Sequence, residues 1–368
     1  MRILHLAYED PAQPGSGGGA IRTREINRRL SQNHEITALV AGYPGATERV
    51  EDGIHWIPIG LQSKNHTLNR LSYFAVMGAK LRQHQFDLLV EDFGAPFSTG
   101  LSPLFTKKPV VAMVQWMFAR EMREKYHLPF DWVERFGLRY YDDFIAVSDW
   151  LAADIQSRRP GVTVEAIPNG VEELAFSVTT GSANHLLFVG RLDIKQKGCE
   201  MMLDAVAAAR RTLGDRLPPL RIVGDGPDQG VLEQQAQRLG ISQRVEFCGR
   251  VSGKDKYQLM ADSTAVLMPS RFETFGMVAV EAQAAGAPVI AFDVGPLADV
   301  AGPGGARLVD PFDVSAFTQQ IVDLVENPAK VAALRQSGRE WARRYNWDAL
   351  AAQQEAHYLR SVESKRSK

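Results

Sequence analysis

The sequence predicts an α/β protein built from two doubly wound, Rossmann-like domains. Short apolar runs alternate along the whole chain with longer stretches of helical length, a pattern typical of mostly parallel sheets covered by helices. A length of 368 residues favours two such domains over one. Near the middle, residues 175–184 are rich in Ser, Thr and Gly and lack strong periodicity, so we expect an interdomain linker there.

The composition excludes several classes of protein. Hydrophobic residues make up 45% and charged residues 23% of the chain, and the net charge of -1 gives no reason to expect nucleic-acid binding. The two cysteines, Cys199 and Cys248, offer neither a disulfide framework nor metal-ligand spacing. The apolar start, Ile3 to Leu6, is too short for a signal-peptide core, and no run approaches the ~18 apolar residues of a membrane span. We therefore expect a cytoplasmic protein.

The first domain is expected to cover residues 1–174. Ligands of such sheets bind beyond the carboxyl ends of the strands. The apolar runs predict seven strands: Ile3–Ala7, Ile36–Val40, Ile54–Pro58, Leu88–Glu91, Val110–Val114, Phe144–Val147 and Val164–Ile167.

Two features follow strands of this domain. Gly17, Gly18 and Gly19 precede a helix expected over 20–30, and glycines let the backbone approach a ligand closely. Their spacing is not that of a dinucleotide fingerprint, which disfavours a dehydrogenase, and a flexible loop is the alternative interpretation. Gln115 follows the strand Val110–Val114, where its amide can contact a ligand or cap a neighbouring helix.

A basic, amphipathic stretch covers residues 62–85 of the same domain. It contains Lys64, Arg70, Lys80 and Arg82 among many apolar residues, and no acidic residue. Such a stretch can lie on an anionic membrane surface. It can equally be a surface helix that packs on the sheet, and we favour this second interpretation.

The second domain is expected to cover residues 183–344. A helix over about 345–368 is then expected to return to the first domain. The six predicted strands are His185–Val189, Leu220–Val223, Val245–Cys248, Thr264–Met268, Val289–Phe292 and Ala306–Val309.

An anion site is predicted where the strand Thr264–Met268 ends. Gly276 opens a helix-like run that begins Met277-Val278, and the first N–H groups of a helix favour negative charge. Glu273 lies in the loop, and Glu281 lies inside the helix among residues expected to be buried. A buried carboxylate needs a partner, and the hydroxyls of a ribose are one. The alternative for Glu273 is a solvated loop charge.

Cations follow other strands on the side expected to face the same cleft. The first strand of this domain leads into Gly190-Arg191-Leu192-Asp193-Ile194-Lys195-Gln196-Lys197-Gly198. Paired cations suit a diphosphate that leaves as negative charge develops, although a solvated basic loop is the alternative and Lys195 fits it well. Gly224-Asp225-Gly226-Pro227 is a turn sequence, and Gly249-Arg250-Val251 follows the next strand.

Together and in this order, these motifs resemble those of the family 4 retaining glycosyltransferases, which have the GT-B fold. The resemblance covers nearly the whole chain. It rests on E-x7-E at Glu273 and Glu281, G-R-L…K-G at 190–198, G-D-G-P at 224–227, F-C-G-R-V at 247–251 and I-P-N-G-V at 167–171.

The resemblance implies a role for each motif. Gly190, Arg191 and Lys197 would bind the diphosphate of a nucleotide sugar, with Arg191, Lys197 and Glu273 serving catalysis. The backbone of Gly276, Met277 and Val278 would contact phosphate and sugar, and Glu273 the sugar. Glu281 would hold the ribose, while Arg250 and Val251 would lie by the base. Gly17, Gly18, Gly19 and Gln115 would serve the acceptor side, the glycines also approaching the donor phosphate.

Gln115 departs from the family pattern, because many relatives have a histidine there. An amide cannot act as a general base, which leaves open a non-catalytic, nucleotide-binding partner protein. A nucleotide-sugar epimerase on a similar fold is a second alternative, but it would need acid/base residues that we do not find at the cleft. The favoured reading of the resemblance remains transfer from a UDP- or GDP-sugar to a glycan, lipid-linked or small-molecule acceptor. No cofactor or metal is expected, since the sequence lacks an obvious D-x-D motif at a strand end.

Overall fold

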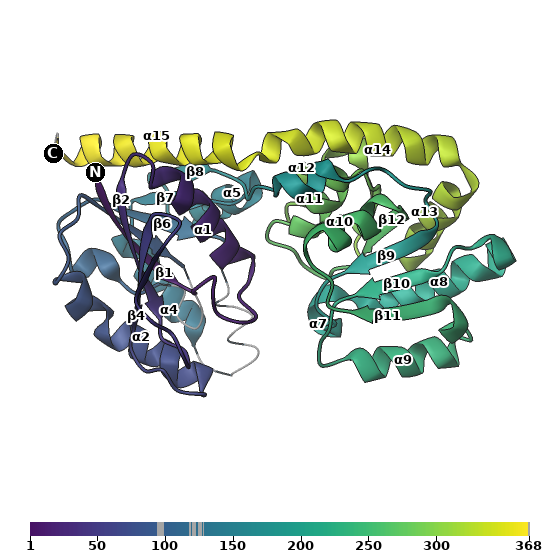
Figure 1. The fold of residues 1–368 in the computed structure, drawn as a ribbon, viewed down its shortest axis with the longest axis horizontal. Helices are drawn as coiled ribbons and strands as arrows, with labels where there is room; N and C mark the ends of the chain where they lie inside the picture. Colours follow the sequence, from purple (N-terminus) through teal and green to yellow (C-terminus); the bar gives the residue numbers. More distant parts are fainter. Residues whose placement is uncertain (94–98, 118, 120–122, 124–126, 128, 367–368) are drawn as a thin grey trace. The chain divides into compact units, whose positions relative to one another are not determined.

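The computed structural model describes residues 1–93, 99–117, 119, 123, 127 and 129–366. The chain forms two compact units (Figure 1). Unit 1 comprises Met1–Asn169 together with Trp347–Lys368, and unit 2 comprises Gly170–Asn346. The chain therefore leaves unit 1 after Asn169 and returns to it at Trp347, as a helix.

The sheet of unit 1 has eight strands in the order β3-β4-β2-β1-β5-β6-β7-β8. Its strands are parallel except for β3, which pairs antiparallel with β4. All seven predicted strands are present, and most of their residues are buried because helices cover a parallel sheet on both faces. The strands are β1 Arg2–Tyr8, β2 Glu35–Ala41, β3 Arg49–Glu51, β4 Ile54–Ile59, β5 Leu88–Asp92, β6 Val110–Val114, β7 Asp143–Ala146 and β8 Thr163–Ala166.

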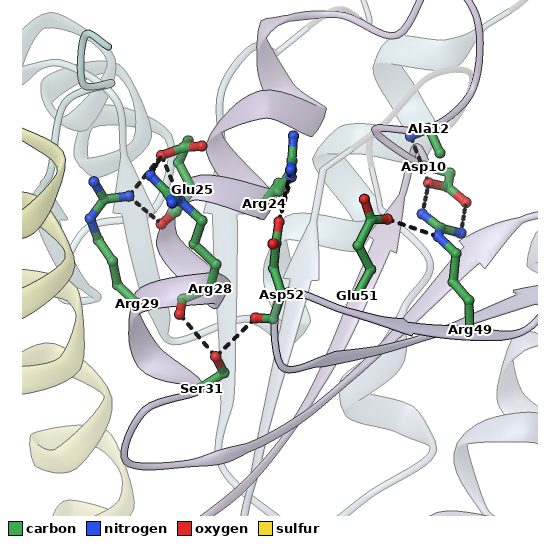
Figure 2. A network of polar contacts seen from close by, with 10 residues as sticks. All are labelled: Asp10, Ala12, Arg24, Glu25, Arg28, Arg29, Ser31, Arg49, Glu51 and Asp52. Atoms are coloured by element: carbon green, nitrogen blue, oxygen red, sulfur yellow. Dashed lines mark hydrogen bonds and ion pairs between the residues drawn. The ribbon is translucent and has the colours of Figure 1, made fainter. Parts of the chain in front are cut away.

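The short strand β3 has no counterpart among the predicted strands. Its three residues, Arg-Val-Glu, carry no apolar run. The Arg49 guanidinium instead holds the strand through two hydrogen bonds to the carboxylate of Asp10, at 2.8 and 2.7 Å (Figure 2). A side-chain contact with a residue distant in sequence thus stabilises a strand that the local sequence does not predict.

The helices of unit 1 begin and end largely as their sequence dictates. The side chain of Asn65 caps α2 by accepting hydrogen bonds from the backbone of Thr67 and Leu68, and Ser148 caps α5 in the same way. The helix α15 packs against α1. The helices are α1 Gly18–Leu30, α2 His66–Leu81, η1 Ser102–Leu104, α4 Phe130–Gly137, η2 Leu138–Tyr140, α5 Asp149–Arg158 and α15 Trp347–Arg366.

The basic stretch of 62–85 contains the helix α2, which packs on the sheet as we favoured. Tyr73, Met77 and Leu81 join the core under this helix. Leu68 and Leu71 remain 48% and 41% exposed on its outer side.

The sheet of unit 2 has six parallel strands in the order β11-β10-β9-β12-β13-β14. Its centre lies at β9 and β12, and every residue of β12 is buried. All six predicted strands are present. They are β9 His185–Val189, β10 Leu220–Val223, β11 Val245–Gly249, β12 Ser263–Met268, β13 Val289–Phe292 and β14 Ala306–Val309.

Twelve helical segments accompany this sheet within the described residues. They are α6 Glu173–Ser177, α7 Ile194–Lys197, α8 Cys199–Leu213, η3 Gly214–Arg216, α9 Gln229–Arg238, η4 Ser242–Arg244, α10 Gly253–Ala261, α11 Met277–Ala285, α12 Leu297–Gly305, α13 Val314–Glu326, α14 Pro328–Ala342 and η5 Arg343–Tyr345.

The linker expected at 175–184 is not a linker. Its first residues belong to the helix α6, where Ala175 is fully buried. Its later residues are held to unit 2 because the backbone N–H groups of Gly181 and Asn184 donate to the carbonyls of Ala261 and Asp262. The polar composition predicted the irregular backbone of residues 178–184, but neither the helix α6 nor the contacts with unit 2.

Candidate functional site

The glycine that opens α11 cannot be replaced without strain. Gly276 has a φ of +91°, and a Cβ added there would lie 2.4 Å from Cδ2 of Leu297. It occupies the N-cap position of α11, and no side chain caps this helix. The strand β12, the loop 269–276 and α11 thus form the strand–loop–helix arrangement that the sequence predicted as an anion site.

Glu273 is held in this loop by a lysine and a serine. The Nζ atom of Lys197, at the end of α7, lies 2.6 Å from Oε1 of Glu273, and the Ser270 hydroxyl donates to the same oxygen at 2.7 Å. The side chains of Lys197 and Glu273 are only 18% and 9% exposed. Two predicted site residues far apart in sequence therefore meet, and Glu273 is not a solvated loop charge.

A close contact between loops sets the position of this pair. Gly198, which follows α7, has a φ of +60°, and a Cβ there would lie 2.2 Å from the carbonyl oxygen of Pro269. Gly295 approaches the carbonyl oxygen of Glu273 in the same way, at 2.4 Å. Glycine at these two positions lets the chain pack directly against the loop that carries Glu273.

Glu281 is paired with a lysine that sequence reasoning missed. Nζ of Lys256, on α10, lies 2.9 Å from Oε1 of Glu281, on α11. Next to Lys256, the buried Tyr257 donates its hydroxyl to Glu172 at 3.2 Å. Burial, followed by the charges of Glu281 and Glu172, raises the pKa of Tyr257 far above its ordinary value, so the phenol stays a donor. The predicted need for a partner at Glu281 is met inside the protein.

The other residues predicted for the donor site are Gly190, which follows β9, and Arg250 and Val251, which follow β11. Both segments contact the loop after β10. Gly190 donates its N–H to the carbonyl of Val223 at 2.9 Å, and a Cβ at Gly224 would lie 1.8 Å from the Gly190 oxygen. Arg250 is exposed and donates to Asp225 at 2.7 Å, which raises its pKa. Val251 follows Arg250 and is half-buried.

Arg191 differs from the other candidate cations. It is exposed, and its guanidinium makes no hydrogen bond or ion pair with any residue that the structure describes. It is therefore available to a ligand without breaking an internal contact, whereas Lys197 would have to share its proton donors with Glu273.

The residues predicted for the acceptor side, all in unit 1, also come together in part. Nε2 of Gln115 donates to the carbonyl of Gly19 at 3.2 Å, and a Cβ at Gly19 would lie 3.1 Å from that nitrogen. The N–H of Gly17, the N-cap residue of α1, donates to Glu9 at 3.2 Å. Burial raises the pKa of Glu9, although this backbone hydrogen bond lowers it. Gln115 thus supports the start of α1, the helix that Gly18 and Gly19 open.

The described residues offer neither a metal site nor a membrane span. Among the described residues, no three His, Cys, Asp or Glu side chains are grouped so that they could hold a metal ion. None of the helices in the described part of the chain has the length and apolar character to cross a bilayer.

Fold and site define a two-unit α/β protein with two lysine–glutamate pairs, one in the loop before the uncapped start of α11 and one on the helix itself. Two family models match the chain in succession: "Glycosyltransferase Family 4" over residues 16–173 and "Glycosyl transferases group 1" over residues 172–341. The chain belongs to the family 4 glycosyltransferases, as the motifs indicated.

Individual relatives agree with this assignment. The MMP alpha-(1->4)-mannosyltransferase of Mycolicibacterium hassiacum is 32% identical over 203 residues, which are 54% of this chain and 49% of the relative. The chain spans about half the length of the curated relatives it matches.

Solved structures share the fold over the whole chain. Sucrose-phosphate synthase from Thermosynechococcus elongatus has a TM-score of 0.79 at 20% identity and covers 99% of both chains. Anabaena HepE in complex with UDP has a TM-score of 0.74 at 20% identity and covers 98% of this chain and 100% of its own. These likenesses confirm the GT-B fold.

Proposed function

We propose that the protein is a retaining glycosyltransferase that moves a sugar from a nucleotide-diphosphate sugar to an acceptor hydroxyl. The observation that carries the proposal is the Lys197–Glu273 contact beside the uncapped start of α11. It combines a cation and an anion-binding helix terminus, which suit a diphosphate, with a carboxylate that suits a sugar hydroxyl. The motif order and the family membership support the same function.

The donor residues divide by the part of the ligand they fit. Arg191 and Lys197 would take the diphosphate, and Gly190, whose own N–H donates to Val223, would let the chain approach it closely. The N–H groups of Gly276, Met277 and Val278 would contact phosphate and sugar. Glu273 would accept from the sugar and Glu281 from the ribose, with Arg250 and Val251 by the base. A UDP- or GDP-sugar is favoured, and UDP is the ligand named for HepE.

The chemistry follows from charge at the leaving group. The bond between the anomeric carbon and the phosphate oxygen breaks, and the acceptor oxygen bonds to the same face of that carbon. The acceptor proton passes to the leaving phosphate oxygen, so the Gln115 amide need not act as a base. Arg191 and Lys197 would stabilise the developing negative charge in place of a metal, which makes the reaction metal-independent.

The acceptor side would use Gly17, Gly18, Gly19 and Gln115. A glycan, lipid-linked or small-molecule acceptor fits this proposal, and the relative above is named as a mannosyltransferase. The exposed Leu68 and Leu71 of α2 lie on the same helix as Arg70, which supports peripheral contact with the cytoplasmic face of a membrane.

Ligand-dependent stabilisation tests the proposal. We expect UDP or GDP, out of UDP, GDP, dTDP and ADP, to raise the melting temperature of the wild type, because a ligand that binds only the folded state stabilises it. Glu281→Ala should lose most of this rise, and Glu340→Ala, which removes an exposed carboxylate from α14, should keep it. No rise with any nucleotide in the wild type would contradict the donor site.

A further inference from the structure

Lys256 is set apart from the other lysine of its helix by its contacts. On α10, Lys254 is exposed, whereas the side chain of Lys256 is only 19% exposed. The Lys256 ammonium lies 2.9 Å from Oε1 of Glu281 and 4.4 Å from the centroid of the Tyr257 ring. A flexible, strongly hydrated ammonium gives up water and side-chain entropy to stay in such a place, which calls for an explanation.

The contact with Lys256 determines what Glu281 can still do. An ammonium has three donors and no acceptor, whereas a carboxylate has about four acceptor positions. Lys256 therefore occupies one side of the carboxylate and leaves acceptor capacity for hydroxyl groups that arrive from outside. The Glu281 side chain is 15% exposed, so an approaching hydroxyl can reach it. Without Lys256, this half-buried charge would lose its only lysine partner within the described residues.

We propose that Lys256 is a positioning residue that orients Glu281 and thereby gives the site its preference for ribonucleotides over 2′-deoxyribonucleotides. The inference rests on the proposed function, since it assumes that Glu281 faces the ribose. The 2′-hydroxyl donates to a carboxylate, and a hydrogen bond to a charged group typically changes affinity by roughly ten- to hundredfold. A carboxylate free to turn away gains less from that hydroxyl.

Paired ligands test this inference. We would measure the dissociation constants of UDP and dUDP, and of GDP and dGDP, by calorimetry on the wild type, Lys256→Met and Lys254→Met. The wild type should bind the ribonucleotide of the accepted base at least about tenfold more tightly. Lys256→Met should reduce this ratio to below about threefold by weakening the ribonucleotide alone. Lys254→Met removes the same charge from the same helix and should leave the ratio unchanged.

The outcomes separate this inference from the proposed function. If the wild type binds none of the four ligands, the proposed function fails and this inference with it. If the wild type discriminates and folded Lys256→Met discriminates equally well, only the role of Lys256 is overturned. Equal weakening of both nucleotides, with a lower melting temperature, would also overturn it, because that result marks a purely structural lysine. Lys256→Gln, which keeps a donor, should retain part of the ratio and serves if the methionine variant does not fold.

Discussion

In unit 2, each glutamate of the candidate site contacts a lysine, whereas in unit 1 two fully buried charged side chains contact neutral groups. Lys197 and Lys256 pair with Glu273 and Glu281. Arg22 of unit 1, which is 1% exposed, donates instead to the carbonyl of Pro168 and to the side chains of Asn169 and Gln354. Burial lowers the pKa of Arg22 to about 10.

Glu91 is the acidic counterpart of Arg22 in unit 1. Its carboxylate accepts hydrogen bonds from the hydroxyl of Tyr141 at 2.6 Å and from the N–H groups of Gly100 and Ser102. Burial raises its pKa, although these hydrogen bonds lower it. Charged side chains therefore serve two different purposes in the two units. A partly exposed pair can rearrange to take a ligand, but a buried charge surrounded by neutral partners holds segments of chain together.

The largest effect expected from this comparison is on turnover. Arg191→Ala combined with Lys197→Ala should lower turnover at least about a hundredfold, because both cations proposed to stabilise the leaving group are lost. The change should be measured as kcat with saturating donor, and the melting temperature should fall only slightly. Lys195→Ala, an exposed lysine of the same segment, is the matched control. A double variant with wild-type kcat would contradict the proposed role of Arg191 and Lys197 in binding the diphosphate.

The next effect is on stability and should appear in unit 1. Glu91→Ala should lower the free energy of unfolding by about 3 kcal/mol, since its buried donors are left without an acceptor. Glu273→Ala should cost less than half of that, because its partners are nearer to solvent, yet it should weaken donor turnover more. Urea denaturation and steady-state kinetics on both variants check this. The comparison breaks if Glu273→Ala proves the more destabilising of the two.

A pH-dependent effect is expected where α15 meets the sheet of unit 1. Nδ1 and Nε2 of His357 lie 2.7 and 2.8 Å from the carboxylates of Glu165 and Asp143. A neutral imidazole has only one N–H, so both contacts are hydrogen bonds when the ring is protonated. Burial lowers the pKa of His357, but the hydrogen bonds and charges of Asp143 and Glu165 outweigh it and raise the pKa above 6.5.

The sign of the pH effect follows from this raised pKa. The stabilisation is fully present below the unfolded-state pKa of about 6.5 and is lost as the pH rises through the folded-state value. The wild type should therefore exceed His357→Gln in free energy of unfolding by more at pH 6 than at pH 8.5, by about 1 kcal/mol. Urea denaturation at the two pH values measures the difference. A gap that does not change with pH would show that the ring is neutral in the folded protein.

Much of the fold could be predicted because it is encoded locally. Each long strand is an apolar run, and Gly276 and Gly198 mark backbone positions with positive φ. The strand β3 could not be predicted, since Asp10 holds it from a distance. The returning helix expected over about 345–368 begins at Trp347, because Tyr345 turns inward and donates its hydroxyl to the carbonyl of Val300.

The site shows the same limit. Motif spacing singled out Lys197 and Glu273 separately, but their contact depends on how the loop after β12 packs against Gly198. Lys256 has no motif around it, and only the docking of α10 against α11 brings it to Glu281. Residues whose role depends on the backbone at their own position could be predicted from the sequence. Residues that reach the site only because two helices pack together could not.

The smallest effect is expected at an exposed ion pair of unit 1, which a buried pair drawn beside it in Figure 2 serves to calibrate. Arg24 and Asp52 contact each other with side chains 45% and 34% exposed, so a double-mutant cycle should give a coupling below about 0.5 kcal/mol that fades in 1 M salt. The bidentate contact of Arg49 with Asp10, whose side chain is fully buried, should give a coupling of about 2 kcal/mol that salt hardly changes. Urea denaturation of the seven proteins (the wild type, four single variants and two double variants), at low and high salt, measures both couplings. Equal couplings would mean that burial does not set the strength of charge pairs here, and the contrast drawn between the two units would lose its physical basis.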